Sequence, residues 1–278
     1  MKLFRNTPFF IQSILVAGML SACQNENNMP VAPQVPSAPS DQNARTSVAT
    51  GALIKDGNTD LAYSSQYQTL LSKETHANCY YEFTYAPQLI TAKGYKYGNP
   101  STECKYILDP YGRCVQSATY WETYIYEYNA SGQLTGFYNK NQPNERRELS
   151  YAADANGWKK SLSQVTFYNE SGVKTKELKF SYGTAAGLIP DKHPLTPDIL
   201  PAEVSKYLPI FGNFNTNLVK VLIEDKYLAN GQKASSNTYM YSYTFDYAGR
   251  VNNITMKKTN GTLVSSTDRK YFVPTYKF

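Results

Sequence analysis

The sequence contains little of the chemistry on which most enzymes depend. It has two histidines, His76 and His193, and neither stands in a catalytic motif. There is no nucleophile-elbow Ser, no Gly-rich phosphate loop and no His-Glu-x-x-His zinc motif. Asp191 and Asp198 flank His193, but turn capping beside prolines explains them more simply than metal or acid–base chemistry. We therefore expect no catalytic residue, metal or cofactor. An enzyme is disfavoured but stays open, because two carboxylates can meet across a sheet without leaving a sequence motif.

Clustered cations are also missing. The formal net charge is +6, and Lys and Arg are scattered, so the electrostatic footprint of a nucleic-acid-binding protein is absent. The chain has four cysteines, of which Cys104 and Cys114 are the closest pair in sequence. The hairpin predicted between them places Cys114 opposite Ile107, which leaves a disulfide undecided. No His or further Cys lies near enough to complete a zinc site.

No hydrophobic run is long enough to form a membrane-spanning helix. The longest extends from Phe9 to Leu20, about a dozen residues against the roughly 20 that a span needs, and it follows two cations. It ends in Leu-Ser-Ala-Cys at positions 20–23. These four residues resemble the bacterial lipobox. The resemblance implies that residues 1–22 are a removed signal peptide and that acyl chains on Cys23 hold the protein to a membrane.

Residues 23–50 form the lipidated Cys and a spacer rich in Pro, Asn and Gln. Pro30, Pro33, Pro36 and Pro39 recur at every third position. This composition cannot bury a core, so we expect a disordered, partly polyproline-like tether. An Asp directly after the lipidated Cys would resemble an inner-membrane retention signal, but this position is Gln24. We therefore expect an outer-membrane location, with the periplasmic or the surface face left open.

Residues 51–278 carry the signal of an all-β domain. The chain has 25 Tyr and 12 Phe, and aromatic side chains favour strands. From Tyr239 to Tyr247 every odd position but one is Tyr and the exception, 245, is Phe, while most even positions are polar. This is the period of two that is typical of a strand. The same alternation recurs at Tyr81/Phe83/Tyr85, Tyr124/Tyr126/Tyr128, Leu178/Phe180/Tyr182 and Val219/Val221/Ile223.

Tight turns separate the predicted strands. An Asp or Asn three residues before a Gly can form a type I turn with a bulge, because its side chain bonds the backbone and Gly accepts positive φ. The pattern occurs at Asp109/Gly112, Asn129/Gly132, Asp154/Gly157, Asn169/Gly172 and Asp246/Gly249. We therefore predict an antiparallel meander of hairpins that forms a curled sheet or half-barrel.

One insertion interrupts the meander at residues 183–217, where alternation stops and prolines are frequent. Ala202 to Leu208 can form a short helix between Pro201 and Pro209. A long insertion is often functional. The simpler interpretation is that it covers an open edge or face of the sheet.

Two segments match a known repeat. Tyr126–Leu134 and Tyr243–Val251 resemble the YD (Rhs-type) repeat, in which Tyr, any residue, Tyr and Asp precede two variable residues, Gly, Arg and Leu. Tyr106–Arg113 fits with Leu108 in place of the second Tyr, and Tyr151–Trp158 fits more loosely. With the lipobox and the Tyr207–Gly212 segment, this resembles a family of secreted bacterial lipoproteins of unknown function. The resemblance implies hairpins but no chemistry.

The leading functional hypothesis is a non-catalytic binding or scaffold module, tethered in the cell envelope, for a protein or glycan partner. Exposed aromatic rows are common contact platforms, and the candidates are Tyr239, Tyr241, Tyr243, Trp121 and Trp158. A one-sided aromatic row is more often the buried face of its own sheet. Two alternatives stay open. One is a half-barrel carrier of a lipid or other apolar ligand with the insertion as its plug, and the other is a glycan-acting enzyme.

Overall fold

The computed structural model describes residues 51–67, 69–153, 160–183, 187–191, 195, 197–215 and 217–273. These residues form sixteen strands and, within these ranges, no helix. The strands are β1 (Leu53–Asp56), β2 (Thr59–Tyr63), β3 (Leu71–Thr75), β4 (Cys79–Ala86), β5 (Leu89–Lys96), β6 (Asn99–Leu108), β7 (Cys114–Ala118), β8 (Thr123–Tyr128), β9 (Leu134–Asn139), β10 (Gln142–Ala153), β11 (Lys160–Tyr168), β12 (Lys174–Ser181), β13 (Val221–Tyr227), β14 (Lys233–Phe245), β15 (Val251–Lys258) and β16 (Leu263–Tyr271).

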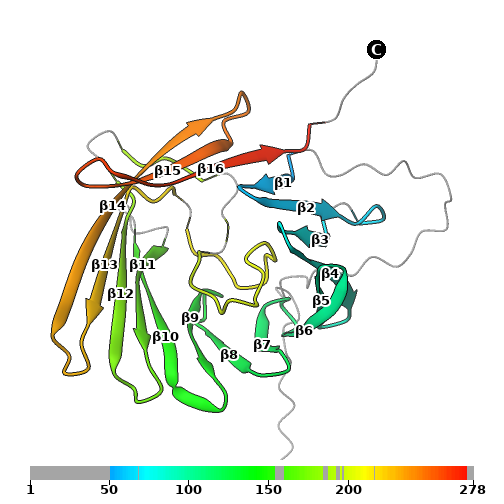
Figure 1. The fold of residues 1–278 in the computed structure, drawn as a ribbon, viewed down its shortest axis with the longest axis horizontal. Helices are drawn as coiled ribbons and strands as arrows, with labels where there is room; N and C mark the ends of the chain where they lie inside the picture. The colour runs from blue at the N-terminus through cyan, green and yellow to red at the C-terminus, as the bar shows by residue number, and fades with distance from the viewer. Residues whose placement is uncertain are drawn as a thin grey trace, which may run out of the picture. The chain divides into compact units, whose positions relative to one another are not determined.

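The strands close into a barrel, so the predicted curled sheet or half-barrel is wrong (Figure 1). Each strand pairs antiparallel with its neighbours in sequence, and β16 pairs with β1 through Leu53 opposite Tyr271 and Asp56 opposite Arg269. Period-two alternation identifies strands, but it carries no information on whether the first and last strands meet. The closing strand β1 has only four residues and no aromatic side chain, so its own pattern is weak.

The short helix predicted at Ala202–Leu208 is also wrong. The insertion between β12 and β13 runs through turns and bends, and it lies within the ring of strands (yellow in Figure 1). Its backbone groups bond the barrel in place of a helical ladder. The Ser205 amide donates to Tyr106 Oη at 3.1 Å, and the carbonyl of Ile210 accepts from the Cys114 amide at 2.8 Å.

The insertion completes the hydrophobic core. Phe211 is fully buried, and its ring lies 6.4 Å from Tyr106 and 5.1 Å from Tyr126, centroid to centroid. Leu208 and Phe214 are buried in the same cluster, together with inward side chains from most of the strands. The barrel interior is therefore a packed core with a plug rather than an open channel.

Tyrosines account for much of the regularity of the wall. The sixteen strands form eight successive pairs, from β1–β2 to β15–β16. In seven of these pairs, a Tyr at or near the end of the later strand donates its hydroxyl to a backbone carbonyl at or near the start of the earlier strand. The distances lie between 2.6 and 3.0 Å for Tyr63, Tyr85, Tyr128, Tyr151, Tyr182, Tyr243 and Tyr271. The exception is β6, where Leu108 occupies the corresponding place. Each such bond stabilises the barrel by about 0.5–1.5 kcal/mol.

The hairpin turns have a common geometry. The amides of Gly112, Gly132, Gly172 and Gly249 donate to the carbonyl oxygens of Asp109, Asn129, Asn169 and Asp246 at 2.8–2.9 Å, and each of these glycines has positive φ. Asp154 and Gly157 lie outside the described residues. Near the first of these turns, Cys114 lies opposite Leu108 rather than Ile107 because a bulge shifts the register, and Cys104 and Cys114 are free thiols.

The two faces of the wall differ in polarity. Most inward positions carry Tyr, Phe, Leu or Val, with charged exceptions such as Glu74 and Arg147, whereas most of the outward positions between them are polar or charged. Ion pairs on the outer face include Lys73–Glu82 (3.3 Å), Lys105–Glu103 (3.2 Å), Arg146–Glu148 (2.7 Å) and Lys179–Glu177 (2.8 Å). They occur on β3, β4, β6, β10 and β12, so the charged outer surface extends around much of the barrel.

Candidate functional site

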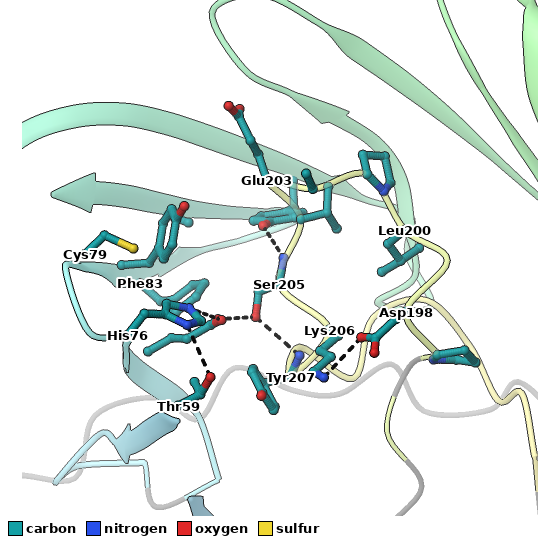
Figure 2. A pocket seen from close by; sticks show the side chains of 18 residues that line it. Thr59, His76, Cys79, Phe83, Asp198, Leu200, Glu203, Ser205, Lys206 and Tyr207 are labelled. Atoms are coloured by element: carbon teal, nitrogen blue, oxygen red, sulfur yellow. Dashed lines mark hydrogen bonds and ion pairs between the residues drawn. The ribbon is translucent and has the colours of Figure 1, made fainter. Parts of the chain in front are cut away.

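A cavity of about 590 Å³ lies between the insertion and the inner face of β2 to β6. The strands contribute Thr59, Glu74, His76, Cys79, Tyr81, Phe83, Ala92 and Tyr106, counting His76 in the turn after β3, and the insertion contributes Pro197, Asp198 and Leu200 to Tyr207. Figure 2 shows the two groups facing each other across the cavity. The volume is in the range of small-molecule sites.

Local sequence explains why this space is left open. After Ile90, the next two inward positions on β5 are Ala92 and Gly94, whose side chains fill little of the space inside the barrel. On the opposite side, Pro197 and Pro201 cannot donate backbone hydrogen bonds, which prevents the insertion from pairing as a further strand. The insertion therefore spans the barrel as a loop, with a cavity beneath it.

A chain of four polar side chains lies at one end of the cavity (Figure 2). Ser205 Oγ donates to Glu74 Oε2 at 2.6 Å, and the other carboxylate oxygen, Oε1, lies 2.9 Å from His76 Nε2. His76 Nδ1 in turn lies 3.2 Å from Thr59 Oγ1. Glu74 and Ser205 are buried, whereas the His76 side chain is partly exposed. The chain fixes the rotamers of donors and acceptors that a ligand would meet.

Charged groups of the insertion flank this chain. Lys206 Nζ forms ion pairs with Asp198 at 3.1 Å and with Asp56 at 3.4 Å, and Tyr207 donates its hydroxyl to Asp56 Oδ2 at 2.9 Å. Burial opposes ionisation of Asp56, but Arg269, Lys206 and Tyr207 together hold its pKa below the usual value. The insertion is therefore fastened to β1 by a buried, ionised carboxylate.

The order of the polar groups suits binding better than nucleophilic catalysis. A Ser nucleophile needs a histidine base on its hydroxyl, with a carboxylate behind the histidine. Here the Glu74 carboxylate stands between Ser205 and His76, and both ring nitrogens of His76 already face other side chains. Across the part of the chain that the structure describes, no group of three or more His, Cys, Asp or Glu side chains is arranged to hold a metal ion.

The binding residues proposed from sequence do not line this cavity. Tyr239, Tyr241 and Tyr243 lie on the inner face of β14, half-buried, with the rings of the last two stacked at 6.4 Å. Tyr243 Oη donates to the carbonyl of Val219, at the end of the insertion, at 2.6 Å. The row of tyrosines therefore lies on the inner face of the barrel, toward the insertion, and does not face open solvent.

Trp121 lies elsewhere, on the turn between β7 and β8, with 77% of its surface exposed beside the equally open Tyr120. Trp158, His193 and Cys23 lie outside the described residues. The cavity residues Glu74, Ser205 and Tyr207 were not singled out as site residues by sequence reasoning. The only available signal was the insertion itself, because long insertions often carry function.

Among the residues described, no helix is long and apolar enough to cross a bilayer.

Comparison with solved structures places the chain among barrels. It is similar to a porin-like protein from Bacteroides vulgatus, with a TM-score of 0.55, 14% identity, and coverage of 80% of this chain and 99% of that one. A porin-like protein from Bacteroides uniformis aligns with a TM-score of 0.41, 16% identity, and coverage of 77% and 89%. No protein-family model matches the chain, and no curated protein matches it. The likeness shows a shared barrel fold.

These findings correct the resemblance to YD-repeat lipoproteins. The structures that align are porin-like barrels, and no family model supports the repeat. The reason is physical. An Asp or Asn side chain that bonds the amides two and four residues on, followed by Gly at positive φ, is a general solution for a tight antiparallel hairpin. The motif therefore reports turn geometry.

Proposed function

We propose that this protein is a lipid-anchored, non-catalytic barrel of the cell envelope that does not span the bilayer and that binds a glycan in the cavity beneath its insertion. The observation that carries the proposal is the composition of the cavity. Aromatic rings from Tyr81, Phe83 and Tyr207 lie beside the fixed Glu74–Ser205–His76 hydrogen-bonding chain. Sugars present an apolar face and a ring of hydroxyls, and this lining offers partners to both.

The anchoring part of the proposal comes from the sequence. The lipobox at residues 20–23 would place acyl chains on Cys23, and two or more chains make a lasting tether. Residues 24–50, extended as polyproline II, would reach about 80 Å from the bilayer surface. The outer membrane is the location we propose. The barrel fold that the chain shares with a porin-like protein is consistent with it.

The polarity of the wall argues against a spanning barrel. Transmembrane barrels present an apolar band about 25 Å tall to lipid, and a Lys or Arg at the bilayer midplane costs about 2–4 kcal/mol. This barrel instead has most of its aromatic side chains inside and ion pairs such as Lys105–Glu103 and Arg146–Glu148 outside. We infer that water, not lipid, surrounds the wall.

The lining favours a polar ligand over a lipid. A carrier of apolar ligands agrees with the volume of the cavity, about 590 Å³. An acyl chain, however, would strip water from Glu74 and Lys206 without offering them hydrogen bonds, and uncompensated burial of charge is costly. A hydroxylated ligand avoids this cost.

Glycan arrays and isothermal titration calorimetry with the purified mature lipoprotein test the binding proposal. We expect a glycan ligand whose affinity falls tenfold or more in Glu74→Gln and in Tyr81→Ala. Glu82→Gln is the matched control, because Glu82 follows Tyr81 directly but points outward. A blank array would overturn the proposal. A co-purified lipid, displaced from the wild type and lost from the Tyr81 variant, would establish the carrier instead.

Fractionation tests the anchoring proposal separately. Cys23→Ser in the full-length chain should release the barrel to the soluble envelope fraction, whereas the wild type stays with membranes. A Cys23→Ser protein that resists alkaline extraction from membranes would contradict a non-spanning barrel.

A further inference from the structure

A second group of residues on the inner face of the barrel lies outside the cavity. Arg147 on β10 is opposite Phe167 on β11, Phe167 is opposite Lys176 on β12, and Lys176 is opposite Lys226 on β13. Side chains at paired positions share a face, and Phe167 belongs to the core cluster, so the whole row faces inward. We call Arg147, Phe167, Lys176 and Lys226 the cationic row.

The positive charge of the cationic row is only partly neutralised. Glu145 lies 3.7 Å from Arg147, and Glu224 lies 3.3 Å from Lys226. Lys176 has no carboxylate within ion-pair distance in the described part of the chain, and its ammonium lies over the ring of Phe167, 4.0 Å from the centroid. Like charges directly opposite each other on neighbouring strands are destabilising, so the Lys176–Lys226 pair has a cost in the empty protein.

The pKa of Lys176 reflects this surplus. Burial lowers the pKa, the neighbouring Arg147 and Lys226 lower it further, and only Glu224 acts in the opposite direction. An anion bound against the row would raise the pKa of Lys176 and so oppose the effect of the two cations.

The guanidinium of Arg147 provides an independent sign of a missing partner. Its Nε is fully buried and has no hydrogen-bond partner. The group lies 5.1 Å from the ring centroid of Phe167 and 5.8 Å from that of Phe137, so two aromatic rings fix its plane. A buried donor without an acceptor is rare in folded proteins and calls for an explanation. The Arg147 side chain as a whole is 23% exposed, so a ligand would meet the terminal nitrogens of the guanidinium rather than Nε.

We propose that the cationic row binds the carboxylate or sulfate groups of an acidic polysaccharide. Neighbouring strands are about 4.8 Å apart, so the row presents cations at about 5 and 10 Å intervals across the sheet. Such spacing suits charges that repeat along a chain better than one isolated phosphate. Phe167 offers a flat apolar surface to a sugar ring, and Arg pairs well with planar carboxylates. The proposal shares with the cavity proposal the premise of a glycan ligand, but it uses different residues.

A matched pair of polymers tests this proposal: polygalacturonate and the same polymer with its carboxylates methyl-esterified. Binding to the purified mature protein is measured by affinity electrophoresis and calorimetry at low and at moderate salt. We expect the wild type to prefer the acidic form by tenfold or more. Arg147→Gln and Lys176→Gln should each remove most of this preference and leave binding of the ester unchanged. Lys105→Gln on the outer face, where Lys105 pairs with Glu103, is the control and should change neither.

Equal affinity of the wild type for the acidic and esterified polymers would overturn the proposal, as would an equal loss in Lys105→Gln. Binding to vesicles of anionic phospholipid that Arg147→Gln abolishes would assign the row to a lipid surface and also overturn it. Thermal melts establish that the variants fold. If Arg147→Gln does not fold, Lys226→Gln serves in its place, because Lys226 is largely exposed. Glu74→Gln should lower binding of both polymers and leave the preference for the acidic form unchanged, so failures of the cavity and of the row are distinguishable.

Discussion

Asp56 on β1 and Arg269 on β16 form a buried ion pair of 2.9 Å at the seam where the barrel closes. Asp56 also contacts Lys206 and Tyr207, so one carboxylate holds together the first strand, the last strand and the insertion. Because all its partners are buried or half-buried, its removal takes from the buried Arg269 the carboxylate to which it is hydrogen-bonded.

Asp56→Ala should therefore destabilise the protein strongly. Removal of one partner from a buried ion pair typically costs about 3–5 kcal/mol. The control is Lys55→Ala, which removes the exposed Lys55–Asp60 pair next to it and should cost less than about 1 kcal/mol. Urea unfolding followed by circular dichroism measures both. A loss of similar size in the two variants would show that the seam does not depend on Asp56.

The same carboxylate should make stability depend on acid pH. The pKa of Asp56 is lower in the folded protein than in the unfolded chain. Its contribution is therefore complete above the unfolded value and is lost as the pH falls through the folded value. Between about pH 6 and about pH 2 the wild type should lose more stability than Asp56→Asn, in which this titration is absent. Parallel unfolding curves for the two proteins across that range would contradict this account.

The strands were predictable from sequence because the pleat imposes a local rule. Tyr239, Tyr241 and Tyr243 share one face of β14, as the alternation indicates. The turns at Asn129–Gly132 and similar positions are equally local, since the Asn side chain bonds amides two and four residues on. Alternation and turn bonds of this kind can be read from the chain.

Closure and the cavity could not be predicted, because their contacts join distant segments. Asp56 and Arg269 are 213 residues apart, and Glu74 and Ser205 are 131 apart. The helix prediction for Ala202–Leu208 failed for the same reason. The Ser205 amide donates its hydrogen bond to the hydroxyl of Tyr106, which comes from a distant part of the chain. Local propensity is a weak guide where tertiary partners compete for the backbone.

The tyrosine hydroxyls that tie neighbouring strands should be individually measurable. Tyr85→Phe removes the bond to the Leu71 carbonyl at 2.7 Å, at a cost of about 0.5–1.5 kcal/mol. Tyr120→Phe is the control, because 83% of Tyr120 is exposed and no change is expected. Chemical denaturation gives the difference, and an unchanged midpoint for Tyr85→Phe would mean that these bonds do not stabilise the barrel.

The three remaining cysteines should differ sharply in reactivity. Burial raises the pKa of Cys104 to about 11 and also raises that of Cys114, so both stay as unreactive thiols. Cys79 is half-buried at the edge of the cavity. At about pH 8, iodoacetamide should label Cys79 first, and mass spectrometry should find the other two labelled only after unfolding in guanidinium chloride. Early labelling of Cys114 would show that the insertion opens in the native state.

Gly212 should be essential for the position of the insertion. Its φ is +82°, and a Cβ there would lie 2.5 Å from the carbonyl oxygen of Gly132, a backbone atom that cannot rotate away. Gly231, in the β13–β14 turn, has a nearly identical φ of +81° but open space around it. Gly231→Ala should therefore cost only the backbone term of about 1–2 kcal/mol. Gly212→Ala carries that term and the clash, so it should be clearly less stable and should weaken glycan binding by displacing Ser205 and Tyr207. Thermal melts and calorimetry compare the two variants, and equal effects would mean that the contact between Gly212 and Gly132 does not hold the insertion in place.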